Sequence, residues 1–228
     1  MPETITVDEM YQIERLVINN NQNGNLTKDK FNLINEQAQY DYMEFLLGDL
    51  RRYQFGRPIP PAAWGMTARI RQSLTPFIQP PTSVTVDPAT GIAPFPPGYQ
   101  MWDAMYWSIY RKRVKFIQQE RLDSHLNSTI NPISRNPVFL SIYTGFEVYP
   151  NDIGAIRLSY IRNPRPIIWG STPDIYGRQV YNPALSSQPE WFREDVIQIM
   201  ARALRMMGVS LQAAQVSQYA DQIKNVGQ

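Results

Sequence analysis

More than any other feature, the positions of the prolines limit how this chain can fold. The 228-residue sequence contains 19 prolines against 12 glycines, and from residue 55 onward a proline recurs every few residues. Proline lacks a backbone N–H and its ring clashes with the preceding turn of a helix, so a long helix cannot run through such a stretch. We therefore expect helices toward the ends of the chain, and strands, turns and extended segments between them.

Residues 1–54 are predicted to form two helices joined by a short polar turn. Thr6 and Glu9 have the spacing of a capping box, in which hydroxyl and carboxylate satisfy unpaired N–H groups at the first helical turn. Apolar residues then recur at helical spacing until the polar run 19–25, and a second helix begins after Thr27. Two helices with so short a connection form an antiparallel helical hairpin.

Residues 55–164 are predicted to form a Pro-rich β domain, a small antiparallel sheet or sandwich with one short helix at 118–128. Aromatic and β-branched residues at 104–110 and 114–118 favour a strand hairpin, although residues 99–110 also fit a buried helix. Apolar and polar residues alternate within 154–164, which is typical of a half-buried strand. Further strands are predicted at 83–87, at 92–96 and within 138–150.

Residues 165–189 show turn signals without a sustained period, and we expect an extended Pro-rich arm. Ordered loops of this length often serve interactions. Residues 190–228 are predicted to form C-terminal helices, the first ending at Gly208, that pack on the N-terminal hairpin. The expected fold class is therefore α+β: a helical bundle with an inserted small antiparallel β-sheet or sandwich and a long Pro-rich arm.

The residue types needed for most catalytic sites are scarce. The chain has no cysteine and one histidine, which excludes thiol nucleophiles, disulfides and zinc sites that use cysteine. Motifs for a nucleophilic serine, a phosphate-binding loop or a dinucleotide are absent from the sequence. Glu190 and Glu194 lie one helical turn apart and could serve a hydrolase, but acids also stabilise a helix N-terminus by themselves. We expect no enzymatic activity, no metal and no cofactor.

The charge balance points away from a protein that wraps nucleic acid. With 22 basic and 20 acidic residues the formal net charge is +2, and charged residues make up 18% of the chain against 12% aromatic ones. Weakly charged, aromatic-rich surfaces are typical of protein interfaces, although the same composition fits an ordinary phage or bacterial protein. No signal-peptide pattern and no apolar run of about 20 residues occurs, so a soluble, unsecreted protein is expected.

Two groups of side chains are candidates for contacts. The stretch SYIRNPRPIIWG (159–170) is interpreted as a strand that leaves its sheet, with Trp169 as an anchor in a neighbouring subunit's pocket. The candidate subunit or partner contacts are Arg162, Arg165, Trp169, Tyr176, Tyr181 and Trp191. The candidates for facing DNA or another acidic surface are Arg51, Arg52, Arg57, Arg111, Lys112 and Arg113. Each basic cluster also falls where a predicted element ends, which is an ordinary place for solvated cations.

Three segments, LSYIRNPRPIIWG, YNPALSSQPEW and ALRMMGVSLQAAQVSQYADQ, resemble virion structural proteins of tailed phages. The similarity is to the connector or ring proteins (adaptors) below the portal in short-tailed and crAss-like phages. It covers roughly the last third of the chain closely and the N-terminal hairpin more loosely. The resemblance implies a homo-oligomeric ring, commonly a dodecamer, that joins the portal to the tail and leaves a channel for DNA.

The same resemblance implies the partners and the location. Partners would be the portal protein, adjacent tail or ring proteins, and double-stranded DNA in the channel without sequence specificity, with no membrane involved. The protein would lie in the neck or tail of the virion after assembly in the host cytoplasm. The alternatives are another virion or head-completion component and a nucleic-acid-binding protein that uses the arginine and aromatic clusters.

Overall fold

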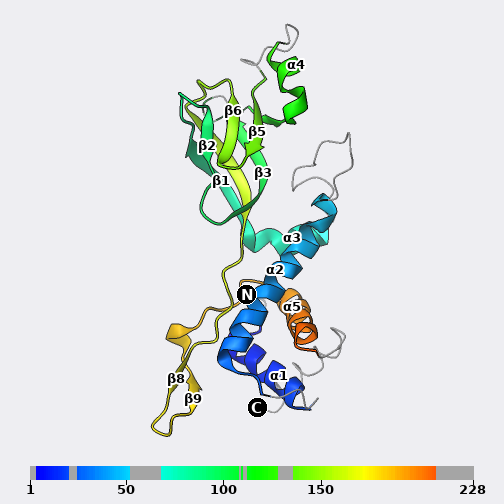
Figure 1. Cartoon of the computed structure of the whole chain (residues 1–228), viewed down its shortest axis with the longest axis vertical. Helices are drawn as coiled ribbons and strands as arrows, with labels where there is room; N and C mark the ends of the chain where they lie inside the picture. Colours follow the sequence, from blue (N-terminus) through cyan, green and yellow to red (C-terminus); the bar gives the residue numbers. More distant parts are fainter. Residues whose placement is uncertain are drawn as a thin grey trace. The chain divides into compact units, whose positions relative to one another are not determined.

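The computed structural model describes residues 4–20, 25–51, 68–107, 109, 112–127 and 136–208. The chain divides into two compact units. The terminal unit combines Met1–Gly48 with Pro164–Gln228, and the middle unit is Asp49–Asn163. In Figure 1 the terminal unit runs from blue to pale blue and resumes in gold and orange, and the middle unit holds the cyan, green and yellow strands.

The middle unit contains two β-sheets. The first sheet is antiparallel, with the order β1 (Ile78–Thr85), β7 (Ala155–Arg162), β3 (Tyr99–Trp107). The second has the order β2 (Ile92–Pro94), β6 (Gly145–Tyr149), β5 (Val138–Ile142), β4 (Lys115–Phe116), and its β4–β5 pair is parallel. Two short helices, α3 (Ala68–Leu74) and α4 (Leu122–Leu126), belong to the same unit.

Side chains from both sheets share one hydrophobic core in the middle unit. Met105, Ile156 and Leu158 come from the first sheet, and Phe139 and Phe146 come from the second. The two phenylalanine rings meet edge to face at 5.6 Å between centroids, a favoured arrangement of aromatic pairs. The strand predicted within 154–164 is confirmed as β7, which lies at the centre of its sheet.

Two predictions for this region were wrong in detail. The hairpin predicted from 104–110 and 114–118 forms only in part: the Val114 N–H donates to the Met105 carbonyl at 2.9 Å, but β4 then pairs with β5 in the second sheet. Strand β1 begins at Ile78, earlier than the predicted 83–87, although Pro80 and Pro81 lie within it. An edge strand tolerates proline, and the register with β7 shifts between Gln79 and Thr82 to accommodate them.

The terminal unit contains three helices, a two-stranded hairpin and an extended segment. The helices are α1 (Val7–Asn20), α2 (Lys28–Arg51) and α5 (Arg193–Met206). The hairpin consists of β8 (Ser171–Pro173) and β9 (Gln179–Tyr181), so residues 165–189 are more ordered than the predicted arm. The predicted capping box is confirmed, since the Thr6 N–H donates to Glu9 Oε2 at 2.7 Å and the Glu9 N–H to Thr6 Oγ1 at 3.3 Å. The helix predicted after Gly208 lies outside the described residues.

The predicted helical bundle is wrong. The described part of the chain contains five α-helices and three sheets, with a largely β middle and helices toward the two ends. The physical reason lies in residues 164–170, which are extended and contribute Ile167 and Trp169, 0% and 4% exposed, to the core of the terminal unit. The helices of this unit therefore pack against an extended segment as well as against one another (Figure 1).

A carboxyl group is buried between α1 and α2. Glu14 and Asn35 are both 0% exposed, and the Asn35 amide donates to Glu14 Oε2 at 3.0 Å and to the Phe31 carbonyl at 3.1 Å. Burial raises the pKa of Glu14 to about 8, and the hydrogen bond from Asn35 opposes this shift only in part. Glu14 is therefore mostly protonated at neutral pH.

We predict that Glu14 makes the terminal unit less stable as the pH rises. The pKa of Glu14 is about 8 in the folded chain and near its ordinary 4.5 when unfolded, so the folded state binds the extra proton between these values. The free energy of unfolding then falls with rising pH across that window, by at most roughly 1.4 kcal/mol per pH unit. Urea unfolding measured from pH 5 to pH 8, within that window, tests the slope.

Glu14→Gln keeps the shape of the neutral side chain and removes the group that titrates. We expect its unfolding free energy to depend less on pH than that of the natural chain, whereas Glu36→Gln on α2 serves as a control and should leave the slope unchanged. Equal slopes for Glu14→Gln and the natural chain would contradict the assignment.

Candidate subunit interface

Trp169 holds the extended segment 164–170 against both N-terminal helices. Its indole Nε1–H donates to Asp8 Oδ1 of α1 at 2.9 Å, and its backbone N–H donates to Asn32 Oδ1 of α2 at 2.8 Å. The indole ring stacks on Tyr11, with 4.1 Å between centroids and 16° between planes. A side chain with this many partners fixes where the segment lies within the terminal unit.

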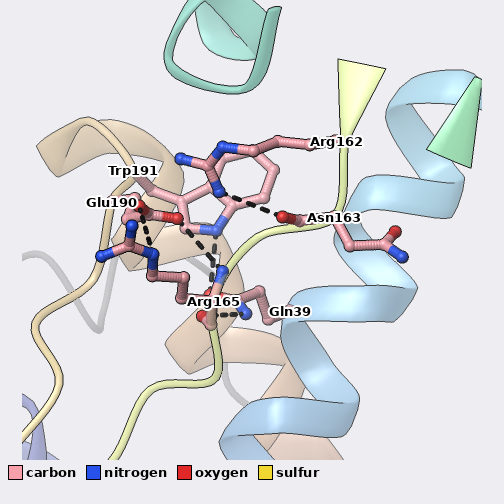
Figure 2. Close-up of polar contacts among 6 residues, drawn as sticks. All are labelled: Gln39, Arg162, Asn163, Arg165, Glu190 and Trp191. Carbon is pink, nitrogen blue, oxygen red and sulfur yellow. Dashed lines mark hydrogen bonds and ion pairs between the residues drawn. The ribbon is translucent and has the colours of Figure 1, made fainter. Parts of the chain in front are cut away.

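A second polar cluster fastens the start of the same segment (Figure 2). The Gln39 amide donates to the Arg165 carbonyl at 2.9 Å and accepts from Trp191 Nε1–H at 3.1 Å. Glu190 accepts from the Arg165 backbone N–H at 3.1 Å and lies 3.7 Å from its guanidinium. Because Gln39 is 0% exposed, these bonds satisfy an amide that would be costly to bury unpaired.

The β8–β9 hairpin grows directly out of this fastened segment. Its register pairs Ser171 with Tyr181 and Pro173 with Gln179. The turn is closed by Asp174, whose Oδ1 accepts from the backbone N–H groups of Tyr176 and Arg178, each at 2.8 Å. Such aspartate turns pre-order a loop without help from the rest of the protein. In Figure 1 the gold hairpin projects away from the helices of its own unit.

Two contacts brace the base of the hairpin on its return side. Gln188 donates to the Tyr181 hydroxyl at 3.0 Å and accepts from the Val7 N–H at 2.9 Å, which ties β9 to the start of α1. The Gly170 N–H donates to Ser186 Oγ at 2.9 Å. A Cβ on Gly170 would lie only 2.3 Å from the Leu185 carbonyl oxygen, so no other residue fits there without movement.

An open groove of about 950 Å³ lies between β9 and the two N-terminal helices. Three aromatic side chains, Tyr11, Trp169 and Tyr181, line it, and the last two are 6.2 Å apart between ring centroids. Charged groups of both signs also line it, among them Lys28 and Asp29. We call this the aromatic groove. Most of the other lining residues are polar or charged, so the groove presents a mixed surface.

The hairpin carries exposed apolar side chains that its own chain does not cover. Ile175 is 91% exposed, Tyr176 78% and Val180 50%. Exposed apolar groups gathered on a projecting element mark interaction surfaces more often than isolated ones do. The tip of the hairpin, Asp174–Gly177, and the aromatic groove are the two parts of the candidate interface.

The structure separates the predicted contact residues into exposed and buried ones. Tyr176 lies at the exposed tip and Tyr181 is half-buried in the groove wall. Arg165 is exposed beside Glu190. Trp169 and Trp191, 4% and 1% exposed, lie in the core of their own unit, so Trp169 has no surface to offer a neighbour's pocket.

The remaining predicted residues belong to the middle unit or lie outside the described part. Arg162 closes β7, with its guanidinium 5.5 Å from the centre of the Phe77 ring and donating to the Asn163 carbonyl at 3.1 Å. Lys112 and Arg113 are exposed. The side chain of Arg51 and all of Arg52, Arg57 and Arg111 lie outside the described residues.

Sequence reasoning missed most of the residues that build this interface. Asp8, Asn32 and Gln39 follow no local motif for their roles, because their partners are more than 120 positions away. The hairpin did leave a signal, because Asp174 and Gly177 flank a two-residue turn between short β-prone runs. The prolines around that turn obscured the signal.

No protein-family model matches the sequence, and no curated protein matches it. Among the described residues, no group of three or more histidine, aspartate or glutamate side chains is placed to hold a metal ion. No helix in the described ranges is long and apolar enough to cross a membrane.

We predict that Gly170→Ala weakens the base of the hairpin. The new Cβ would overlap the Leu185 backbone, and such overpacking costs roughly 3 kcal/mol of unfolding free energy. Gly177→Ala is the matched control at the tip, where a Cβ meets nothing within 4 Å and only the φ of +76° is unfavourable. That control should lose roughly 1 kcal/mol, and equal losses in urea unfolding would contradict the close approach at Gly170.

Proposed function

We propose that this chain is a structural virion subunit that assembles into a ring connecting a phage portal to the tail. The observation that carries the proposal is the β8–β9 hairpin, a pre-ordered element with Ile175 and Tyr176 exposed at its tip and a base fixed to the core. A pre-ordered, apolar projection binds a partner without a large ordering cost. An assembling subunit needs such a surface.

The resemblance to connector proteins supports the same proposal. Two of the resembling segments, LSYIRNPRPIIWG and YNPALSSQPEW, contain the groups that fasten the hairpin: Trp169, Gly170, Ser186, Gln188 and Trp191. The similar stretches therefore coincide with the part of the chain that presents the projection. The proposed partners are the portal protein and adjacent tail or ring proteins, with DNA passing through the channel.

The proposal predicts a closed oligomer of fixed copy number in the virion. We expect native mass measurement of the connector complex, released from particles whose genome encodes the chain, to give a discrete ring, with a dodecamer as the expected size. Quantitative mass spectrometry of intact particles supplies the copy number independently. Absence of the chain from purified particles, or a single copy per particle, would contradict the proposal.

A DNA titration separates this role from that of a nucleic-acid-binding protein. We expect the isolated chain to bind duplex DNA negligibly, because its formal net charge is only +2. A dedicated binder would show measurable affinity that falls steeply with salt, with a log–log slope set by the number of neutralised phosphates. A steep slope in this titration would favour the alternative.

A further inference from the structure

The tip of the β8–β9 hairpin stands clear of its own chain. Ile175 is 91% exposed and Tyr176 78% exposed. A Cβ built on Gly177 meets no atom within 4 Å. Two hydrogen bonds to Asp174 hold the turn in shape before any partner arrives, so little conformational entropy is lost on docking.

The aromatic groove borders the open edge of β9. Residues 178–181 all line the groove, whereas no residue of β8 does. Side chains of a strand alternate between its two faces, so four consecutive lining residues indicate that the strand presents its edge. The edge of a two-stranded hairpin leaves backbone N–H and C=O groups open to a partner.

The hydrogen-bond pattern shows which backbone groups of β9 face that edge. The Asn182 N–H donates to the Gly170 carbonyl at 2.9 Å and the Asp174 N–H to the Arg178 carbonyl at 2.8 Å. Bonded and non-bonded pairs alternate along an antiparallel ladder. The N–H and C=O groups of Gln179 and Tyr181 therefore point away from β8, toward the groove.

The opposite edge of the hairpin is less suited to pairing. By the same alternation Ser171 and Pro173 face outward from β8. Pro173 has no N–H to donate, and proline is a common means of blocking a sheet edge. The hairpin therefore has one receptive edge, on β9, and a chemically different tip.

We propose that the hairpin tip of one copy of this chain docks in the aromatic groove of a neighbouring copy. The apolar pair Ile175 and Tyr176 matches the accessible apolar part of the lining, which is Tyr11, Val180 and Tyr181. Asp174 in the tip is acidic, and the groove is lined by three basic side chains, Arg15, Lys28 and Arg178, against the two acids Asp8 and Asp29. The inference rests on the proposed function, in which identical copies are neighbours.

This contact joins two different surfaces, so it is head-to-tail and not two-fold symmetric. An open chain of such contacts keeps one unused tip at one end and one unused groove at the other until it closes into a ring. The groups that supply the tip and one groove wall lie on the same hairpin. A single element therefore links each subunit to both of its neighbours.

Cysteine cross-linking tests the contact directly, because the natural chain contains no cysteine. Full-length Tyr176→Cys, at the tip, is mixed with full-length Gln12→Cys, which is exposed in the groove lining. We expect the mixed disulfide to exceed either homodimer by roughly tenfold, as proximity raises the effective concentration. Tyr143→Cys, 99% exposed in a turn of the middle unit, replaces Tyr176→Cys as the control and should give no excess.

Two variants, which place acidic residues in the tip or in the groove, test the direction of the contact. The tip variant Ile175→Asp/Tyr176→Asp and the groove variant Val180→Glu should each fail to form rings alone. Their mixture should stop at a heterodimer, because one intact groove meets one intact tip. Tyr143→Asp should assemble normally, which controls for the loss of an exposed aromatic side chain.

The possible outcomes separate a failure of the docking inference from a failure of the proposed function. Rings that form with a mutated tip, or cross-links from the tip to a different virion protein, would overturn the docking inference and leave the connector role standing. No excess of the mixed disulfide in assembled rings would overturn it as well. Absence of rings in virions, with the mixed disulfide still in excess, would instead count against the connector role alone.

Discussion

The terminal unit depends on the way the buried Trp169 is satisfied. An indole N–H that leaves water needs an acceptor, and Asp8 at the start of α1 supplies one at 2.9 Å. The Asn32 side-chain oxygen on α2 accepts from the Trp169 backbone N–H. The Asn32 amide nitrogen donates a longer hydrogen bond, of 3.5 Å, to the Trp169 carbonyl. One residue thus holds together two helices and a segment that lies more than 130 positions later in the chain.

The hairpin takes its position from that anchor. Its first strand begins at Ser171, two residues after Trp169, so there is little chain in which the direction could change. Its second strand is tied through Gln188 to the first residue of α1. With both ends fixed and the turn closed by Asp174, the exposed tip is a defined projection of the terminal unit. Its apolar side chains can then meet a partner in one geometry.

The local features of the fold could be predicted from the sequence, and the long-range ones could not. Thr6 and Glu9 cap α1 as their spacing indicates, and Gly208 takes the positive φ of +86° expected after a helix. The core strand β7 follows from its alternating residues. In each case the partners lie within a few positions of one another.

The errors arose where distant residues decide the outcome. Residues 164–170 have no helical or strand period, and their burial depends on side chains such as Asn32 and Gln39 from α2. The expected bundle failed because the sequence gives no sign that this segment enters the core. The indole of Trp169 was predicted to reach a neighbour, since nothing near it in sequence reveals Asp8 as its acceptor. Strand β1 was predicted too short because it contains two prolines, which a register shift against β7 accommodates at the edge of the sheet.

Hydrogen exchange at the backbone amides of Gln179 and Tyr181 tests the central claim most directly. These N–H groups face the open edge of β9, so they should exchange rapidly in the isolated chain. In the proposed ring, a docked neighbour should slow them markedly, together with the amides of the hairpin tip. Exchange in this stretch that is the same before and after assembly would contradict the claim that the hairpin joins one subunit to the next.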